Sequence, residues 1–254
     1  MKKVVFVTGA SGNLGSVIVQ KLRLKKYKVY SGSRTKAGRE GWIQLDITSD
    51  SDCRKAIKQI IDKEGRIDVL VNNAGLSLAG PTAGFSSKDY LNILNINAVG
   101  AFRLIKEVIP YMKKQKSGKI INITSLNGFA ALPNFGLYSS SKFALEALGQ
   151  SLRYELAGSG IWVTNIAPGA ILNKSENSPN LPHKSAREKF WFLKILLPMI
   201  SNKEVAREVI NVIKNPSPPP RVILGNDAKI TYLLQKFLPM AFWDKLMLYI
   251  WNKD

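Results

Sequence analysis

The sequence predicts one α/β domain in which helices cover both faces of a mainly parallel, doubly wound sheet. Short apolar runs alternate with longer stretches of helical periodicity along the 254 residues, as consecutive βαβ units require. The apolar runs lack the polar–apolar alternation of a half-exposed strand, which indicates a sheet covered on both sides. Neither an internal repeat nor a low-complexity tract divides the chain, so residues 1–254 are expected to form a single domain.

The expected strands are short and almost wholly apolar. In chain order they are Val4–Val7, Val29–Ser31, Trp42–Leu45, Val69–Val71, Ile120–Ile123, Trp162–Ile166 and Val222–Leu224. The first of these runs stops at Thr8 and Gly9, so it is shorter than the apolar core of about 7–15 residues in a signal peptide. We therefore interpret it as a buried strand.

The expected helices lie between these strands. They are Asn13–Lys25, Asp50–Glu64, one or two helices within Tyr90–Lys114, and Tyr138–Ala157. In Asp50–Glu64 the apolar side chains recur at the spacing of one helix face. Residues 170–201 break the alternation and are expected to form a variable loop, and residues 227–254 form an apolar C-terminal extension.

The composition excludes several classes of site. Cys53 and His183 are the only cysteine and the only histidine, so a disulfide, a zinc site and a Ser-His-Asp hydrolase are not expected. The net charge is +19, but the lysines are scattered, which favours a solvated basic surface over a nucleic-acid site. No apolar stretch has the length of a transmembrane helix, so we expect a cytoplasmic protein.

A glycine-rich turn follows the first strand and precedes the first helix. Gly9, Gly12 and Gly15 would allow a tight turn, a close approach of backbone to phosphate, and close packing of helix on strand. The helix that follows directs its N–H groups at the same place. This arrangement predicts a Rossmann-type dinucleotide site.

The end of the second strand favours NADP over NAD. An NAD site commonly has a carboxylate there for the ribose 2′-hydroxyl, whereas an NADP site has an arginine for the 2′-phosphate. Here the chain reads Ser33-Arg34-Thr35-Lys36, without a carboxylate. Arg34 would pair with the phosphate, and Lys36 would add positive charge.

Three side chains predict acid–base chemistry at a carbonyl or alcohol. Tyr138 and Lys142 are four residues apart, so on a helix they share a face, and an ammonium group favours the phenolate form of a neighbouring tyrosine. Ser125 ends the strand Ile120–Ile123 at the edge where open α/β sheets bind ligands. Two hydroxyl groups near a carbonyl oxygen would stabilise the charge that develops there.

These pieces resemble the short-chain dehydrogenases/reductases, and among them the compact subfamily. The matching pieces are Thr8-Gly9, Gly12, Gly15, Asp46, Asn72-Asn73-Ala74-Gly75, Asn97-Ala98-Val99-Gly100, Ser125, Tyr138-x-x-x-Lys142 and Pro168-Gly169, in the order of the family. The resemblance covers about residues 4–170. It implies a seven-stranded parallel sheet, hydride transfer at a nicotinamide, and a homodimer or homotetramer formed through helices around 87–115 and 138–158.

The resemblance also implies a role for each site residue. Tyr138 would be the general acid in reduction, Lys142 would bind the ribose and lower the pKa of Tyr138, Ser125 would bind the substrate oxygen, and Asn97 would hold a proton-relaying water. The residues expected to contact the cofactor are Gly9, Ser11, Gly12, Asn13, Leu14, Gly15, Ser33, Arg34, Asp46, Ile47, Asn73, Ala74, Gly75, Thr124, Tyr138, Lys142, Pro168, Gly169, Ile171 and Asn173.

Two positions depart from the family pattern. Compact members usually have their second glycine one place later than Gly12, and often have threonine at the place of Asn173. The spacing resembles extended, epimerase-like members, whereas the chain length and Asn73-Ala74-Gly75 resemble the compact group, which we follow. An asparagine at 173 still donates and accepts hydrogen bonds.

The substrate is expected to be lipophilic, for example an acyl, steroid or retinoid-like ketone, aldehyde or alcohol. Residues 170–201 are rich in Leu, Phe and Trp, which would suit either a cap over such a substrate or the core packing of a short helix. Residues 227–254 are similarly apolar and would suit a membrane-surface contact, a cover for the substrate cleft or a subunit interface. Two other classes are a catalytically silent dinucleotide sensor and a membrane-surface binder on the same fold. The complete set of Ser125, Tyr138 and Lys142 argues against a sensor, which needs no proton donor.

Overall fold

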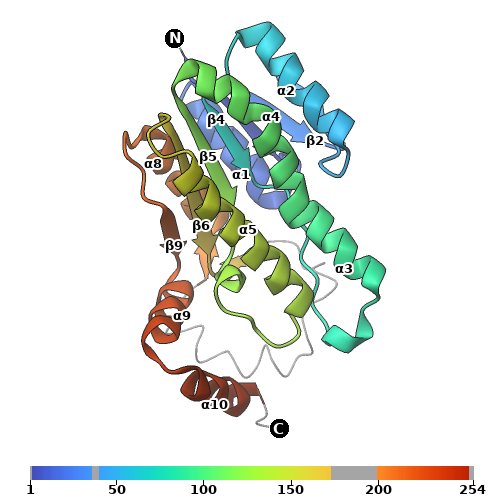
Figure 1. The fold of residues 1–254 in the computed structure, drawn as a ribbon, viewed down its shortest axis with the longest axis vertical. Coiled ribbons are helices and arrows are strands. Elements are labelled where there is room, and N and C mark those ends of the chain that lie inside the picture. The colour runs from blue at the N-terminus through green and yellow to red at the C-terminus, as the bar shows by residue number, and fades with distance from the viewer. Residues whose placement is uncertain (1, 36–39, 173–198, 252–254) are drawn as a thin grey trace.

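The centre of the molecule is a seven-stranded parallel sheet, as the sequence predicts. A computed structural model describes residues 2–35, 40–172 and 199–251. The strands are β1 (Val4–Thr8), β2 (Lys28–Ser33), β3 (Trp42–Gln44), β4 (Val69–Asn72), β5 (Gly118–Ile123), β6 (Ile161–Pro168) and β9 (Arg221–Leu224). Their order is β3-β2-β1-β4-β5-β6-β9, so the direction of winding reverses between β1 and β4 (Figure 1). Such a reversal is where doubly wound sheets bind ligands.

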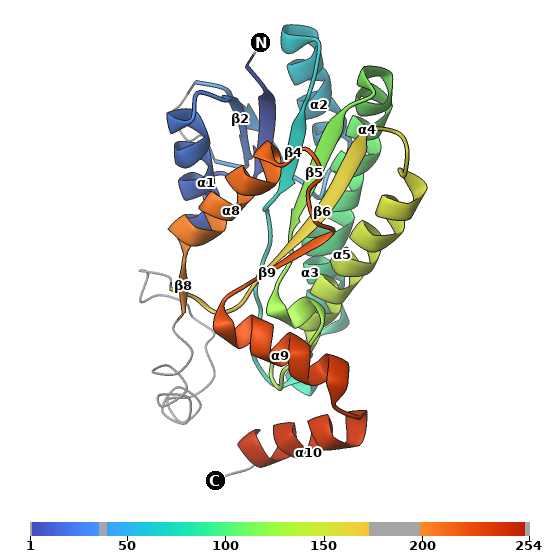
Figure 2. The same cartoon turned by 90° about the vertical axis from the view of Figure 1, so that its left-hand side faces the viewer.

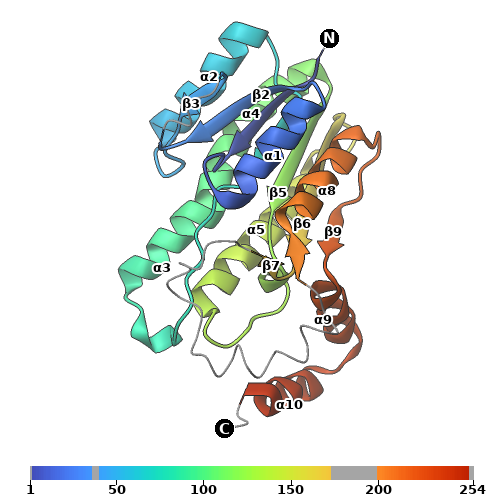
Figure 3. The same ribbon diagram turned by 180° about the vertical axis from the view of Figure 1, so that it is seen from behind.

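Helices cover both faces of this sheet. On one face lie α1 (Asn13–Leu24) and α8 (Asn202–Lys214). On the other lie α2 (Asp50–Glu64), α4 (Gly100–Gln115) and α5 (Gly136–Glu155). Figure 3 shows α1 and α8 in front of the strands, and Figure 1 shows the opposite face. Two separate apolar cores result, one on each side of the sheet.

The ends of α2 show why its predicted bounds are those observed. The Ser49 side chain accepts a hydrogen bond from the Asp52 N–H at 3.2 Å, which caps the first turn. Gly65 ends the helix in the left-handed conformation, with φ of 70°. The predicted strands likewise match the observed ones to within two residues at either end.

The stretch Tyr90–Lys114, left open as one or two helices, contains three pieces. It begins within α3 (Ser87–Leu94), continues as a single π-helical segment over Asn95–Val99, and ends in α4. Such π segments are rare and occur often at functional sites. This one carries Asn97.

The remaining elements lie at the carboxyl end of the sheet. A 3₁₀ turn, Leu126–Gly128, follows β5, and the short strands β7 (Ile171–Leu172) and β8 (Ile200–Ser201) pair with each other. The C-terminal extension forms α9 (Asn226–Phe237) and α10 (Met240–Trp251). Figure 2 shows this helix pair beyond the ends of β5, β6 and β9. No helix in the described ranges has both the length and the apolar character of a membrane span.

Candidate active site

The glycine turn packs against itself and against the end of β4. Gly9 has φ of 62°, and a Cβ atom there would come within 2.7 Å of the Ala74 Cα. A Cβ at Gly15 would lie 2.1 Å from the Gly9 carbonyl oxygen. Among the described residues no side chain caps α1, whose N-cap is Gly12. The first-turn N–H groups therefore suit a phosphate, as a dinucleotide requires.

Thr8 and Asn73 join the two strands at the reversal of winding. The Thr8 hydroxyl accepts hydrogen bonds from the backbone N–H groups of Asn73 and Ala74, both at 3.0 Å. The Asn73 amide nitrogen donates to the Thr8 carbonyl at 2.9 Å. Asn73 thus fixes the glycine turn, and Ala74 and Gly75 follow it along the same edge of the sheet.

The predicted 2′-phosphate residues lie at the end of β2. Arg34 is exposed there, while Ser33 is buried. The Ser33 hydroxyl donates to the Thr35 carbonyl at 2.8 Å and accepts from the Trp42 indole at 3.0 Å, so it mainly shapes the turn. Arg34 is therefore the better placed of the two predicted residues for a phosphate. Lys36 lies outside the described residues.

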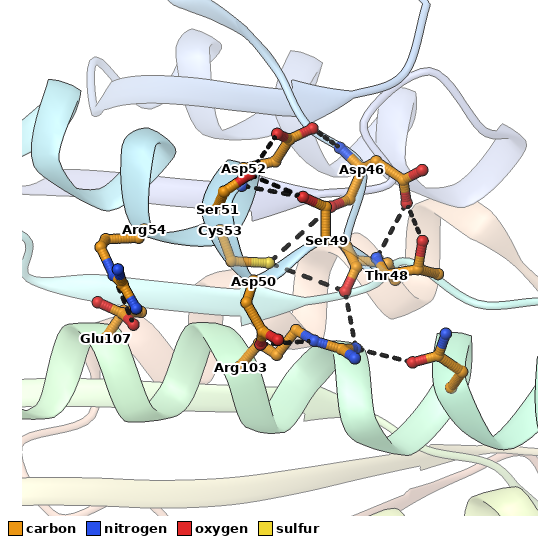
Figure 4. A network of polar contacts seen from close by, with 12 residues as sticks. Asp46, Thr48, Ser49, Asp50, Ser51, Asp52, Cys53, Arg54, Arg103 and Glu107 are labelled. Atoms are coloured by element: carbon orange, nitrogen blue, oxygen red, sulfur yellow. Dashed lines mark hydrogen bonds and ion pairs between the residues drawn. The ribbon is translucent and has the colours of Figure 1, made fainter.

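Asp46 and Ile47 come shortly after β3, at the expected adenine end of the site, and Figure 4 shows Asp46 with its hydrogen-bond partners. The backbone N–H and the hydroxyl of Thr48 both donate to the Asp46 carboxylate. These two hydrogen bonds, the backbone one first, hold the pKa of Asp46 below its ordinary value. The Ile47 carbonyl accepts from Arg103 at 3.2 Å, and Arg103 also donates to the Asn95 side chain at 2.8 Å. Arg103 thereby connects the adenine end to the π segment that carries Asn97.

Ser125 and Tyr138 come together from β5 and α5. Ser125 caps the 3₁₀ turn, and its hydroxyl accepts from the Asn127 N–H at 3.2 Å. Ser125 also lies close enough to the Tyr138 hydroxyl to favour its phenolate form. Burial nevertheless raises the pKa of Tyr138 above its ordinary value, since it outweighs the effect of Ser125. The lowering of this pKa by Lys142, which the family resemblance implies, stays a prediction.

Lys142 lies one helical turn beyond Tyr138. Its ammonium nitrogen is 5.7 Å from the centre of the Tyr138 ring and donates to the Ile123 carbonyl at 3.0 Å. Only 5% of Lys142 is exposed, and this burial lowers its pKa to about 8, against an opposing effect of Glu146. A cationic group with a pKa near neutrality is suited to exchange protons with its neighbours.

Asn97 is buried within the π segment. Its amide nitrogen donates to the Leu76 carbonyl at 2.8 Å and to the Ser141 hydroxyl at 2.9 Å, and its oxygen accepts from the Leu76 N–H at 2.7 Å. A Cβ at Gly75 would lie 3.3 Å from that oxygen and 3.6 Å from the Lys142 nitrogen. The side chain thus retains one lone pair for the predicted water.

The last group of predicted residues follows β5 and β6. The Thr124 hydroxyl donates to Glu146 at 2.6 Å, so this side chain points into the interior. Pro168 is the last residue of β6, at the carboxyl edge of the sheet, and Gly169 follows it. A Cβ at Gly169 would come within 2.0 Å of an Asp227 carboxylate oxygen. Ile171 lies in β7. Asn173 and most of the predicted substrate loop lie outside the described residues.

Three residues that contact the site were given no role from the sequence, although Thr8 belongs to a motif quoted there. Thr8 clamps the glycine turn, Arg103 links two ends of the site, and Glu146 contacts the segment before Ser125. The spacing of Lys142 and Glu146, four residues on one helix, was the available signal for Glu146. Nothing local marks Arg103, because its partners lie on other elements.

The fold and the glycine turn define a dinucleotide-binding domain, and comparison with known proteins identifies its family. The sequence model described as short chain dehydrogenase matches residues 3–181. The chain belongs to this family and is an oxidoreductase. The 3-ketodihydrosphingosine reductase of Bacteroides thetaiotaomicron is 29% identical, over 97% of this chain and 96% of its own length.

Two further similarities span most of the chain. Retinol dehydrogenase 8 of Homo sapiens is 28% identical, over 86% of this chain and 80% of its own length. A short-chain dehydrogenase from Burkholderia cenocepacia, solved in complex with NADP, is 25% identical with a TM-score of 0.80, over 96% of this chain and 97% of its own. Both similarities extend well past the residues that the family model matches.

Proposed function

We propose that this chain is an NADPH-dependent reductase of a carbonyl group on a lipophilic molecule, with Tyr138 as the proton donor. The observation that carries the proposal is the meeting of Ser125, Tyr138 and Lys142 beside the carboxyl end of β5. The same groups would serve the reverse reaction, oxidation of the alcohol, with Tyr138 as base.

The roles follow from the chemistry of carbonyl reduction. NADPH, when bound along the glycine turn, supplies two electrons and a proton to the carbonyl carbon as a hydride. Negative charge then develops on the carbonyl oxygen, where the hydroxyl groups of Ser125 and Tyr138 stabilise it. The Tyr138 hydroxyl gives its proton to this oxygen. Its raised pKa keeps the phenol protonated at neutral pH, and Lys142 limits the charge left on it.

The preference for NADPH rests on Arg34. It is an exposed guanidinium at the end of β2, where the chain has no carboxylate between Ser31 and Thr35. The complex of the Burkholderia relative with NADP supports the same assignment. Replacing Arg34 with glutamate should raise the KM for NADPH by roughly tenfold to a hundredfold, the effect of losing a charge-assisted pair, and should spare NADH.

The lipophilic substrate is supported by the relatives and by the C-terminal helices. A sphingosine-related ketone and retinol appear in the names of the two curated relatives. In this chain α9 packs on the segment that follows Ser125, because the Tyr232 and Phe129 rings meet edge to face at 5.3 Å. An apolar surface thus adjoins the reacting groups.

A graded series of ketones tests the function. NADPH consumption is followed with butanone and with a long-chain methyl ketone in detergent, and with NADH in parallel. We expect kcat/KM to rise about fourfold for each methylene that becomes buried, and NADPH to be preferred at least about tenfold. Faster turnover of butanone would refute the lipophilic substrate, and absence of turnover with every ketone and alcohol would refute the function.

We also propose that α9 and α10 rest on an anionic bilayer. Large apolar side chains are exposed along this helix pair, namely Ile230, Leu233, Phe237, Met240, Phe242, Leu248 and Tyr249. The exposed lysines 229, 236 and 245 stand among them, against a single exposed carboxylate at Asp244. Apolar groups mixed with cations suit the boundary of an anionic bilayer, and the net charge of +19 adds attraction.

Specific side-chain contacts attach the helix pair to the body and leave the apolar side chains named above exposed. With its amide oriented to satisfy both partners, Gln235 donates to the Phe129 carbonyl and accepts from the Trp243 indole at 3.2 Å. Trp243 is the buried anchor of α10. A bilayer at this end of the molecule would present a lipophilic substrate near the residues after Ser125.

Vesicle sedimentation tests this contact. The protein should sediment with phosphatidylglycerol vesicles and stay in solution with phosphatidylcholine vesicles. Phe237→Asp combined with Phe242→Asp should abolish sedimentation, while Tyr154→Asp, at an exposed site on α5, should not. Equal behaviour of the two vesicle types, or a loss of oligomers instead of vesicle binding in the double variant, would refute the bilayer contact.

The homodimer or homotetramer stays a proposal that α4 and α5 support. Phe102 on α4 and Phe143 on α5 are 46% and 41% exposed. Burying these rings against a second copy would remove a large apolar area from water. Sedimentation velocity of the Phe143→Asp variant tests the assembly: we expect it to shift toward the monomer, and an unchanged size would exclude this face.

A further inference from the structure

We propose that Glu146 and Arg221 are a positioning pair for the reaction. Glu146 holds the segment that carries Ser125 against the helix that carries the acid–base groups, and its charge supports the ammonium group of Lys142. Arg221 holds Glu146 in place and limits that charge. The inference rests on the proposed function, since it assigns a role in proton transfer.

The Glu146 carboxylate is buried among hydrogen-bond donors. Only 4% of the residue is exposed. One oxygen accepts from the Thr124 hydroxyl at 2.6 Å, and the other accepts from the Asn165 amide at 2.9 Å and from Arg221 at 2.8 and 3.0 Å. A buried charge is tolerated only when it is paired and hydrogen-bonded, and all these partners donate.

Glu146 connects α5 directly to the segment of Ser125. Thr124, its partner, immediately precedes Ser125. Gly128, at the end of the 3₁₀ turn, lies so close that a Cβ there would come within 2.9 Å of the Glu146 Cγ and 3.2 Å of the Lys142 carbonyl oxygen. Movement at Glu146 would therefore change how the two hydroxyl groups meet.

The same carboxylate acts on Lys142 through its charge. The two residues are one turn apart on α5, and both are buried. Lys142 donates to the Ile123 carbonyl, next to Thr124. Glu146 favours the charged form of Lys142, against the burial that lowers its pKa. Among the described residues, the titratable or charged groups that contact Lys142 or act on it are Tyr138 and Glu146 on its own helix, and Arg221 reaches Glu146 from β9.

A row of amides across the sheet fixes this arrangement. Asn72, Asn122 and Asn165 are in register on β4, β5 and β6, and Arg221 continues the row on β9. The Asn72 amide donates to Asn122 at 2.9 Å, and Asn122 donates to Asn165 at 3.0 Å. The row ends on Glu146, so the carboxylate ties four strands to the helix of the acid–base groups.

The pH dependence of ketone reduction separates this role from a structural one. The alkaline limb of kcat reports loss of a proton from the coupled Tyr138 and Lys142 pair. Glu146→Gln removes a negative charge and should move that limb to lower pH. Arg221→Met removes a positive charge and should move it to higher pH. Each shift should be about 0.5–1 pH unit, or roughly threefold to tenfold in activity at one alkaline pH.

The opposite signs are decisive, because a loss of packing would affect both variants alike. Glu155→Gln, at an exposed site on the same helix, is the matched control and should leave the limb unchanged. Arg221 is partly exposed, so its variant tests the proposal even if Glu146→Gln fails to fold. Shifts of the same sign, or lower kcat with an unchanged limb, would overturn the inference. An inactive wild-type protein would instead overturn the proposed function.

Discussion

At the scale of one residue, the buried ammonium group of Lys142 lowers the free energy of unfolding. The structure places a cation in the interior, with a carbonyl partner at 3.0 Å and a pKa of about 8 instead of the ordinary 10.5. Such a group carries a proton less readily in the folded than in the unfolded chain. Its stability cost is therefore full below pH 8 and disappears as the pH rises toward 10.5.

Replacing Lys142 with methionine should raise stability and destroy activity. The free energy of unfolding at pH 7 should rise by about 1–3 kcal/mol, because the buried ammonium is removed while its volume is kept. Urea denaturation at pH 7 and at pH 10 measures this gain, which should shrink at the higher pH. Lys88→Met, at an exposed site on α3, is the control and should change little at either pH. A variant less stable at pH 7 would contradict the account.

At the scale of one element, a single added methyl group tests whether the glycine turn holds the cofactor. In Gly15→Ala the new Cβ would meet the Gly9 carbonyl oxygen at 2.1 Å, so the turn or α1 must move. The Kd for NADPH should rise at least about tenfold, as binding depends on the placement of the first-turn N–H groups. Fluorescence titration with NADPH measures this effect.

Gly84→Ala is the matched control for that variant. Among the described residues, none beyond its chain neighbours would lie within 4 Å of a Cβ at Gly84, which lies in the 3₁₀ turn Thr82–Gly84, outside the glycine turn. Its Kd for NADPH should equal that of the wild type. If Gly15→Ala also binds with wild-type affinity, the glycine turn does not hold the cofactor phosphates.

Elements with local signals were predictable from the sequence, and those fixed by distant partners were not. Ser49 and Gly65 mark the ends of α2 in the chain itself, so its bounds were predicted as they are. The π segment Asn95–Val99 has no such signal, because Asn97 is held there by Leu76 and Ser141. Asn97 was therefore predictable from the sequence, whereas the π-helical form of its backbone was not.

The candidate site divides in the same way. Tyr138 and Lys142 lie one turn apart on α5, as their spacing predicts. The raised pKa of Tyr138 was missed, because it depends on burial by other elements. Thr124 was expected to contact the cofactor, and the hydrogen bond of its side chain to Glu146, 22 residues away, was not predicted. The pKa of Tyr138 and the hydrogen-bond partner of Thr124 both depend on residues distant in the sequence, so no local sequence pattern predicts them.

At the scale of the whole molecule, the net charge of +19 opposes the compact state. Like charges repel over the surface, and salt screens them beyond a distance of about 8 Å at physiological ionic strength. The Tm should therefore rise by roughly 2–6 °C when sodium chloride is raised from about 10 mM to about 300 mM. Calorimetry measures this shift. A fall in Tm would mean that attractive ion pairs outweigh the repulsion.

The central claim is that the Tyr138 hydroxyl gives its proton to the substrate oxygen. The most direct measurement is kcat for ketone reduction and the Kd for NADPH in the Tyr138→Phe variant, with Tyr154→Phe as control. Loss of one hydroxyl should lower kcat by about 10²–10⁴-fold and leave the Kd within about twofold of wild type. Retention of wild-type kcat by Tyr138→Phe would contradict the account.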